Sequence, residues 1–396
     1  MSAHAHLRPT PVGGEYWTPF VKFLFGVFAV SAVLMVWRFF VGLGPATALS
    51  DSYPWGIWIA FDVVIGTALG CGGYAMALLV YIFNRGKYHA LVRPAILTSA
   101  LGYTMAAIAI NVDVGRPPYL YKIPVMPHWW NLNSVLLEVA VCVMTYVAVL
   151  WIELSPALFE TWRQGQSPFL RKIAQTFTPV VEKLMIPLIA VGVLLPTMHQ
   201  SSLGSLMIIA GQKLHGLWQT PLLPLLFLIS CATMGYSVVA IESHLSASAF
   251  RRPRETGMLG KLAVVCGWAT VAYLAIRIVD IVARGKLGLM FQPSVQALCF
   301  WAEIVMFAWA AVLMLSQRRT MPRHQLTAGW LGVLAGSLYR IDAYLVGYNP
   351  GPNWSYFPSL AEVLITLGII ALEIMVYLYI VRRYPILRGP SPAVAK

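Results

Sequence analysis

The chain has 396 residues, of which 59% are hydrophobic and 11% are charged. Soluble domains carry roughly 25% charged residues, so this composition excludes an ordinary soluble protein and indicates one that lies in a membrane. The formal net charge of +13 would also suit a nucleic-acid-binding protein. Its distribution along the chain decides between these two classes.

Apolar stretches long enough to cross a bilayer, whose core needs about 20 apolar residues per helix, follow one another along the chain. We predict ten spans, at 20–41, 57–83, 92–112, 134–156, 180–198, 222–243, 259–283, 294–316, 325–346 and 359–381. The sequence therefore predicts an all-α polytopic membrane protein. Residues 1–19 form an N-terminal segment, 20–383 the ten-helix transmembrane domain, and 384–396 a tail.

Successive connections between spans lie on alternate sides of the membrane, and the basic residues are concentrated on one of these two sides. Twenty lysines and arginines fall on the side of both termini, and five fall on the other side: Arg116, Lys122, Lys213, Arg284 and Lys286. Basic connections stay in the cytoplasm, so we expect both termini to be cytoplasmic. The net charge reflects this topology, and we expect no nucleic-acid partner.

Cysteine and histidine spacing does not favour a bound metal cofactor. The five cysteines lie within spans and form no C-x-x-C pair, as an iron–sulfur site would need: Cys71, Cys142, Cys231, Cys266 and Cys299. His199 lies at the outer end of the fifth span and His244 at the inner end of the sixth, so they cannot share a haem iron. Pairing of His199 with a methionine stays open. We expect no haem, iron–sulfur cluster or other metal site in this chain.

Ionisable side chains inside the spans are the main functional signal, because each costs roughly 2.5 kcal/mol or more at the bilayer centre. Nine carboxylates lie there: Asp62, Glu138, Glu153, Glu242, Asp280, Glu303, Asp342, Glu362 and Glu373. Only Arg38, Arg277 and Arg340 share the membrane with them. The six unmatched acids must be neutral, hydrated or held by other polar groups. Buried acids of this kind are typical of proton relays.

The three arginines within the spans can also have structural roles. Arg277 and Asp280 are three residues apart on one helix face, which predicts that they pair. We expect Arg340 and Asp342, two residues apart, to find partners on neighbouring helices. Arg38 is expected to extend its side chain to the outer interface.

Two outer connections are rich in proline and aromatic residues, at 113–134 and 348–356. Glycine and proline end the preceding helix and favour ordered turns. Both connections indicate a partner surface or the roof of a pocket. The apolar segment Leu203–Leu217 is predicted to be a helix lying at the outer interface.

The Asp-x-Gly-Arg-Pro turn at Asp113–Pro117 resembles that of the NrfD-like (polysulfide-reductase-type) family, whose members are quinone-interacting membrane subunits of respiratory complexes. The similarity includes Asp62 in Ile59–Asp62, Tyr103 in Leu101–Tyr103 and the opening Trp55–Trp58, and it extends over nearly the whole chain. It implies two four-helix bundles, at about 57–200 and 222–347, flanked by the first and last helices. It also implies a place in the bacterial inner membrane and no cofactor in this subunit.

The resemblance is nearest to members that serve nickel–iron hydrogenases. It implies a ferredoxin-like iron–sulfur subunit on the periplasmic face, together with the small and large nickel–iron subunits. Electrons would pass from hydrogen through these partners to menaquinone or ubiquinone, the substrate of this chain. The expected role is thus the membrane subunit of a hydrogen:quinone oxidoreductase.

Carried over to this sequence, the family's quinone region implies Tyr103, Asp113, Arg116, Glu138 and His199. Tyr103 and His199 can donate hydrogen bonds to quinone carbonyls, and Glu138 can deliver protons. Alternatives stay open: Tyr103 only packs the bundle, and His199 only caps a kinked helix. Asp113 and Arg116 could also form a local ion pair that locks the turn.

Glu242 and Glu373 lie nearer the cytoplasm and are candidates for a proton path from that side, with Asp62 at its outer end. Three other functions remain. One is the membrane subunit of a polysulfide, nitrite, tetrathionate or other quinone-linked oxidoreductase. The others are a proton-coupled transporter and a passive anchor without quinone contact.

Overall fold

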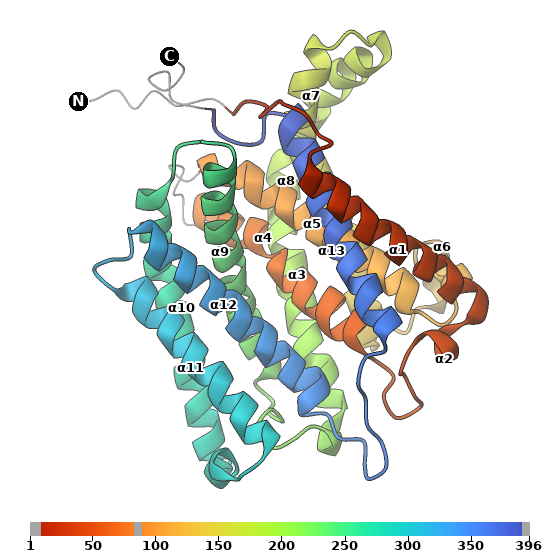
Figure 1. The fold of residues 1–396 in the computed structure, drawn as a ribbon, viewed down its shortest axis with the longest axis vertical. Coiled ribbons are helices and arrows are strands. Elements are labelled where there is room, and N and C mark those ends of the chain that lie inside the picture. The colour runs from red at the N-terminus through yellow and green to blue at the C-terminus, as the bar shows by residue number, and fades with distance from the viewer. Residues whose placement is uncertain (1–8, 83–88, 390–396) are drawn as a thin grey trace.

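The computed structural model describes residues 9–82 and 89–389, and helices make up the regular structure of this part of the chain. Figure 1 shows long helices packed side by side, with α1 (Pro19–Val41) beginning and α13 (Leu360–Arg383) ending at the same end of the molecule. The predicted all-helical fold is confirmed. Residues 1–8 and 390–396 of the expected terminal segments, and residue 83 of the second expected span, lie outside the described residues.

Nine helices in the described ranges are long and apolar enough to cross a membrane. Between α1 and α13, the α- and π-helices are α2 (Leu43–Ala46), η1 (Trp58–Ile65), α3 (Gly66–Leu69), α4 (Gly72–Ala77), η2 (Leu78–Ile82), α5 (His89–Asp113), α6 (Lys122–Val125), α7 (Val135–Gln164), α8 (Pro168–Ile209), α9 (Leu223–Ala249), α10 (Thr256–Ala283), α11 (Val295–Leu315), α12 (Pro322–Ile341) and η8 (Asp342–Val346). Four short 3-10 helices, η4 (Pro117–Tyr119), η5 (Pro127–Trp129), η6 (Gly211–Lys213) and η7 (Leu287–Phe291), lie in the connections. Helix α12 occupies the ninth predicted span but is not among the nine apolar helices, because it carries Arg323, His324, Gln325 and Arg340. The count of ten spans therefore stays a prediction.

The second span is not one regular α-helix. It consists of wide π-helical turns in η1 and η2, with the short helices α3 and α4 between them and a break at Gly70–Cys71. Packing explains the break, because a Cβ on Gly235 of α9 would come 2.5 Å from the Cys71 backbone oxygen. Widened turns inside helices frequently accompany functional sites, and Asp62 lies on η1.

Helices α7 and α8 form a hairpin that is longer than the membrane requires. The sequence predicted spans at 134–156 and 180–198, whereas α7 has 30 residues and α8 has 42. At 1.5 Å per residue, α8 is roughly 63 Å long, about twice the thickness of the hydrocarbon core. The turn between the two helices projects beyond the other helices in Figure 1, at the end where α13 finishes.

Serine side chains fix where several helices begin. Ser134 accepts a hydrogen bond from the backbone of Leu137 at the start of α7, and Ser294 does the same for α11. At α13, Ser359 and Glu362 form a reciprocal capping box. These bonds satisfy donors that the first helical turn leaves free. Glu362, one of the nine membrane carboxylates, is therefore a capping residue.

The helices fall into two groups with extensive contacts between them. In the first group α5 contacts η1, α4 and α7, and α7 packs along α8; in the second, α9 to α12 pack against one another. Helix α1 packs against α13. The groups meet through α4 with α9, α8 with α9, and η1 with α12. The predicted boundary between the two bundles, near residues 200–222, therefore lies between helices that pack closely against each other. The division into two four-helix bundles stays a prediction.

Candidate functional site

Tyr103 of α5 lies in a buried cluster of aromatic and sulfur-containing side chains in the first helical group. Its side chain is fully buried. The ring meets that of Tyr146 on α7 edge-on, with centroids 4.6 Å apart, and that of His199 on α8 at 5.7 Å. The hydroxyl lies 3.8 Å from Cys71 Sγ. Gly70 allows this approach, because a Cβ there would come 2.9 Å from the Tyr103 ring. The structure thus brings Tyr103 and His199 together.

The hydrogen bonds of His199 fix its tautomer. Its Nε2 lies 3.1 Å from the Thr67 hydroxyl, which itself donates to the Val63 carbonyl at 2.6 Å. A threonine hydroxyl has one hydrogen, so His199 Nε2–H must donate to Thr67. His199 Nδ1 is then an acceptor, and it is buried without a hydrogen-bond partner in the described part of the chain. The site therefore offers a free acceptor beside the Tyr103 ring.

A polar chain connects His199 to Arg340 of α12. Gln200 donates from Nε2 to the Thr67 hydroxyl at 3.2 Å, and its Oε1 accepts from Arg340 at 3.1 Å. Arg340 also donates to Ser230 at 3.1 Å and stacks over the Phe227 ring at 5.1 Å. The prediction that Arg340 finds its partners on other helices is confirmed.

Sequence reasoning missed Gln200 and Thr67. A signal for Gln200 was present, because His199, Gln200, Ser201 and Ser202 form a polar run soon after the apolar stretch 184–196. Asp342 is a different case, because both of its carboxylate oxygens are buried without a hydrogen-bond partner among the described residues. No partner on a neighbouring helix is therefore found for it.

The remaining quinone candidates lie toward the end of the first group that is formed by the end of α5 and the start of α7. Asp113 ends α5, ten residues after Tyr103, which corresponds to roughly 15 Å along the helix axis. Glu138 lies in the first turn of α7, eight residues before Tyr146, or roughly 12 Å along that helix. Arg116 is exposed in the connection after α5. These three side chains therefore do not share the immediate surroundings of Tyr103.

Arg38 of α1 faces the turn after α5. Its side chain is 2% exposed and donates to the Val114 carbonyl at 2.6 Å. The expectation that Arg38 extends to the outer interface is wrong, because this backbone carbonyl holds the guanidinium inside. No ion pair joins Asp113 to Arg116 among the described residues. The alternative of a turn locked by that pair is therefore not supported.

Glu242 and Glu373 line one cavity on the side of the molecule that carries the chain ends. The cavity has a volume of about 480 Å³, and most of its other lining side chains are apolar. Glu242 of α9 accepts a hydrogen bond from Tyr377 of α13. The Glu373 carboxylate lies beside Gly102, where a Cβ would be 3.6 Å from its Oε1. Gly102 immediately precedes Tyr103, so Glu373 approaches the buried cluster.

Asp62 lies apart from this cavity. It accepts a hydrogen bond of 2.8 Å from Thr366 of α13, and it is not among the residues that line the cavity. Glu362, on the same helix as Thr366, is held by Tyr356 at 2.7 Å and by the backbone of Ala48 at 2.9 Å. Two of the carboxylates that lack an intramembrane arginine are thus held by neutral donors.

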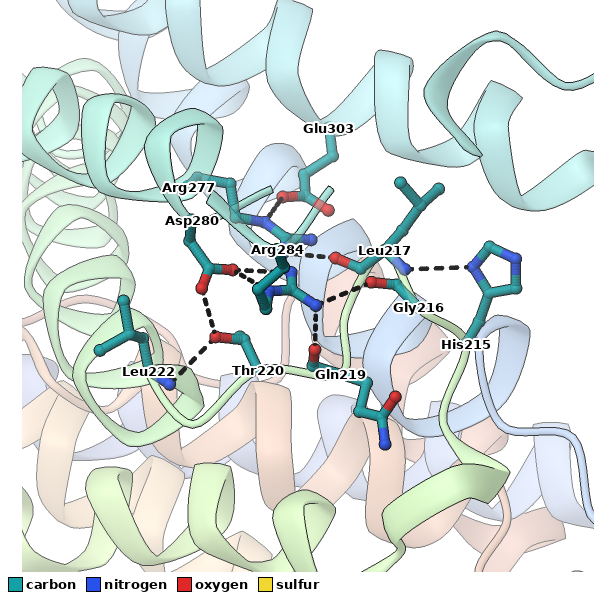
Figure 2. Close-up of polar contacts among 10 residues, drawn as sticks. All are labelled: His215, Gly216, Leu217, Gln219, Thr220, Leu222, Arg277, Asp280, Arg284 and Glu303. Carbon is teal, nitrogen blue, oxygen red and sulfur yellow. Dashed lines mark hydrogen bonds and ion pairs between the residues drawn. The ribbon is translucent and has the colours of Figure 1, made fainter. Parts of the chain in front are cut away.

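A second polar network lies in the second helical group and is drawn in part in Figure 2. Arg277 of α10 pairs with Glu303 of α11 at 3.5 Å and donates to the Leu217 carbonyl at 2.7 Å. Glu303 also accepts from Tyr273 at 2.8 Å and from Trp218 at 3.2 Å. Both charged side chains are fully inaccessible to solvent. The carboxylate is therefore surrounded by donors on both oxygens.

The predicted pairing of Arg277 with Asp280 is wrong. Asp280 pairs instead with Arg284 at 2.7 Å and accepts from Thr220 at 2.8 Å (Figure 2). Spacing along one helix allowed the predicted pair, but α11 presents Glu303 to Arg277, and Arg284 lies one helical turn after Asp280.

The expected interfacial helix at Leu203–Leu217 is also wrong. Helix α8 continues to Ile209, and the chain after it turns inward. Leu214, Leu217 and Trp218 are buried, and the backbone of this connection supplies carbonyls to Arg277 and Arg284 (Figure 2). The segment therefore packs into the second polar network.

Comparisons with known proteins agree on one family. The family model "Polysulphide reductase, NrfD" matches residues 45–341. The chain is 39% identical to the "Probable Ni/Fe-hydrogenase 2 b-type cytochrome subunit" of Escherichia coli, over 96% of this chain and 95% of that one. It is 35% identical to a protein of Nitratidesulfovibrio vulgaris over 91% and 92% of the two chains. The "Menaquinone reductase, integral membrane subunit" of that organism is 27% identical over 87% and 84%.

The name of the Escherichia coli relative raises the question of haem. His199 and His244 each use Nε2 in a hydrogen bond, to Thr67 at 3.1 Å and to Gln325 at 2.8 Å. His199 lies ten residues before the end of α8, and His244 lies 21 residues after the start of α9. The start of α9 at Leu223 lies against Gly204 of α8, five residues after His199. Along these two antiparallel helices the two rings therefore differ in depth by roughly 24 Å. These two histidines do not fit axial ligation of one haem iron.

Proposed function

Because the chain belongs to the polysulphide reductase NrfD family, we propose that it is the quinone-reducing membrane subunit of a respiratory nickel–iron hydrogenase complex. It is a multi-pass membrane protein and a homologue of oxidoreductase subunits. The proposal places both termini in the cytoplasm and the complex in a bacterial inner membrane. An iron–sulfur subunit on the periplasmic face receives electrons from the nickel–iron subunits and passes them to menaquinone or ubiquinone.

The observation that carries this proposal is the free acceptor of His199 beside the Tyr103 ring. Reduction of a quinone converts two carbonyl acceptors into hydroxyl donors, and each needs a proton. The Tyr103 hydroxyl can donate to a quinone oxygen, whereas His199 Nδ1 can accept from a quinol hydroxyl. Tyr103 and His199 can therefore bind both the quinone substrate and the quinol product. His199 interacts more favourably with the quinol than with the quinone.

Protons in this proposal come from the inner side of the membrane. Glu242 and Glu373 line the cavity of about 480 Å³ described above, which this proposal places toward the cytoplasm and which we call the inner cavity. The Glu373 carboxylate lies beside Gly102, next to Tyr103. Glu138, near the outer end of α7, and Asp62 on η1 serve the outer end of the path. Asp113 and Arg116 form the turn that faces the electron-donating partner. Uptake from the inner side would store energy in the membrane potential.

Kinetics of the purified complex test the proposal. Tyr103→Phe and His199→Gln are expected to slow hydrogen-driven quinone reduction by about tenfold or more, while hydrogen oxidation with a soluble viologen dye stays normal. Tyr236→Phe is the matched control, since Tyr236 is equally buried but donates to the Leu259 carbonyl in the second group. Unchanged quinone kinetics in both site variants would leave a passive anchor as the better account.

A second candidate is the membrane subunit of another quinone-linked oxidoreductase, such as a polysulfide, nitrite or tetrathionate enzyme. The similarity to a menaquinone reductase subunit favours it specifically. Purification of the native complex distinguishes the two candidates. Nickel–iron subunits that copurify with the chain support the hydrogenase, and any other catalytic subunit supports the alternative.

A further inference from the structure

The chain segments before α1 and after α13 pair through backbone hydrogen bonds, such as Thr10 N–H to the Leu387 carbonyl at 2.9 Å, and one arginine between α9 and α10 bonds to both. Arg252 donates to the carbonyls of Leu387 at 2.7 Å, Thr10 at 3.1 Å and Pro11 at 3.2 Å, and also to that of Arg388. These bonds hold both segments against the α9–α10 connection. We call this arrangement the terminal clamp.

A small polar cavity lies beneath the terminal clamp. Its volume is about 30 Å³, which is room for roughly two water molecules. Glu242, Ser243, Ser246 and Glu255 are among its lining residues, together with Arg252 and Arg388 of the clamp. A buried water needs two to four polar partners, and this lining supplies them.

Glu255 lines this polar cavity together with Arg388 of the terminal clamp. Its Oε1 pairs with Arg388 at 3.2 Å, and its side chain is 9% exposed. Its Oε2 is buried and has no hydrogen-bond partner within the described ranges. Burial raises the pKa of Glu255, and the Arg388 cation opposes that rise. The carboxyl therefore binds a proton more readily than an ordinary exposed glutamate does.

Glu242 connects the polar cavity to the inner cavity. It is among the lining residues of both, and the inner cavity also contains Glu373 and Tyr377. The polar cavity suits water, whereas the inner cavity is mostly apolar. Glu242 therefore lies at the junction of the polar cavity and the mostly apolar one.

We propose that Glu255 takes protons from solvent and passes them through water in the polar cavity to Glu242. This role rests on the proposed inward proton path through Glu242. In each cycle the Glu255 carboxylate accepts a proton, releases it to a bound water, and that water gives a proton to the Glu242 carboxylate. No electrons move, and Glu255 returns to its ionised form. Arg388 is a positioning residue that holds Glu255 at the mouth of the cavity.

The alternative is that the Glu255–Arg388 pair only fastens the chain ends. Proteoliposomes of the whole complex with a pH dye on the side of the chain ends separate the two roles. Glu255→Gln is expected to slow proton uptake during hydrogen-driven quinone reduction by about tenfold, and Glu255→Asp to restore much of it. Glu160→Gln is the matched control, because it breaks the Arg93–Glu160 pair of 2.5 Å with the same charge change. It is expected to leave uptake unchanged.

A pH profile gives a readout that a fastening role would not change. The charged groups facing Glu255 are Arg388, Arg252 and Glu242. Arg388→Gln removes the cation that lowers the pKa of Glu255, so that pKa rises further. The donor must be protonated, so the fall in uptake at alkaline pH is expected to move to higher pH. An unshifted profile would contradict the proposal.

Glu242→Gln separates failure of this inference from failure of the proposed function. If Glu242→Gln stops uptake and Glu255→Gln only lowers the melting temperature, Glu255 is a fastening residue and the inference is overturned. If neither variant changes uptake, the inward path itself is wrong. Loss of uptake in both, with Glu160→Gln normal, supports the proton route from Glu255 to Glu242.

Discussion

The buried arginines illustrate how single residues are stabilised in this membrane protein. Arg277 and Glu303 form a fully buried ion pair, whose hydrogen-bond partners come from α10 and from the connection before α9. Arg277 Nε and Nη2 have no hydrogen-bond partner among the described residues. Arg340 uses an amide, a hydroxyl and an aromatic ring instead of a carboxylate. Removing one partner of a buried pair leaves an uncompensated charge, which costs more than losing the pair as a whole.

Because losing one partner costs more than losing both, the Arg277–Glu303 pair of the second polar network gives a testable prediction. Arg277→Met should destabilise the protein by about 3–5 kcal/mol, because Glu303 is left buried without its cation. The double variant Arg277→Met with Glu303→Gln should recover a clear part of that loss. Thermal melting of the purified complex measures both. If the double variant melts at or below the single variant, the two side chains are not energetically coupled.

At the scale of helices, close contacts between the two groups depend on glycine. Gly235 of α9 lies against the break in the second span, and a Cβ on this glycine would lie 2.5 Å from the Cys71 carbonyl oxygen. That oxygen belongs to the backbone, so it cannot move aside as a flexible side chain could. Packing between α4 and α9 therefore requires a residue without a side chain here.

Substitution tests this dependence on a small residue. Gly235→Ala should lower stability by about 1–3 kcal/mol, because the added methyl group forces α4 and α9 apart. Gly257→Ala is the matched control: a Cβ on Gly257 in α10 meets nothing within 4 Å. Alanine also favours the helix there, so that variant should be neutral or slightly stabilised. Equal melting temperatures for the two variants would show that the close contact is unimportant.

Hydropathy predicted where most helices lie in the chain. It could not predict how each helix is oriented about its own axis, and therefore which side chains of different helices face each other. Apolar length located nine of the membrane helices, because bilayer thickness sets that length. It missed the break at Gly70–Cys71, which depends on contact with Gly235. It also paired Arg277 with Asp280, because partners on other helices depend on the tertiary arrangement. Gln200 was missed for the same reason, since its role depends on Thr67 and Arg340.

Over the whole molecule, the polar groups form a series from the chain-end side toward the buried tyrosine. The polar cavity contains Glu255 and Glu242, and the inner cavity contains Glu242 and Glu373. Glu373 lies beside Gly102, next to Tyr103, whose ring contacts His199. We infer that this series serves proton delivery, while the connections at the opposite end face the electron-donating partner.

The location of the quinone ring is the central claim. Among the residues that the structure describes, the first group leaves the acceptor His199 Nδ1 free beside the Tyr103 ring. In the second group both Glu303 oxygens accept hydrogen bonds, and the free polar atoms belong to Arg277, Tyr339 and Asp342. A photoreactive quinone added to the purified complex, followed by peptide mass spectrometry, tests this difference directly. We predict light-dependent labelling of α5 and α8 near Tyr103 and His199, suppressed by excess unlabelled quinone. Specific labelling near Arg277 and Glu303, with none on α5 or α8, would contradict the account.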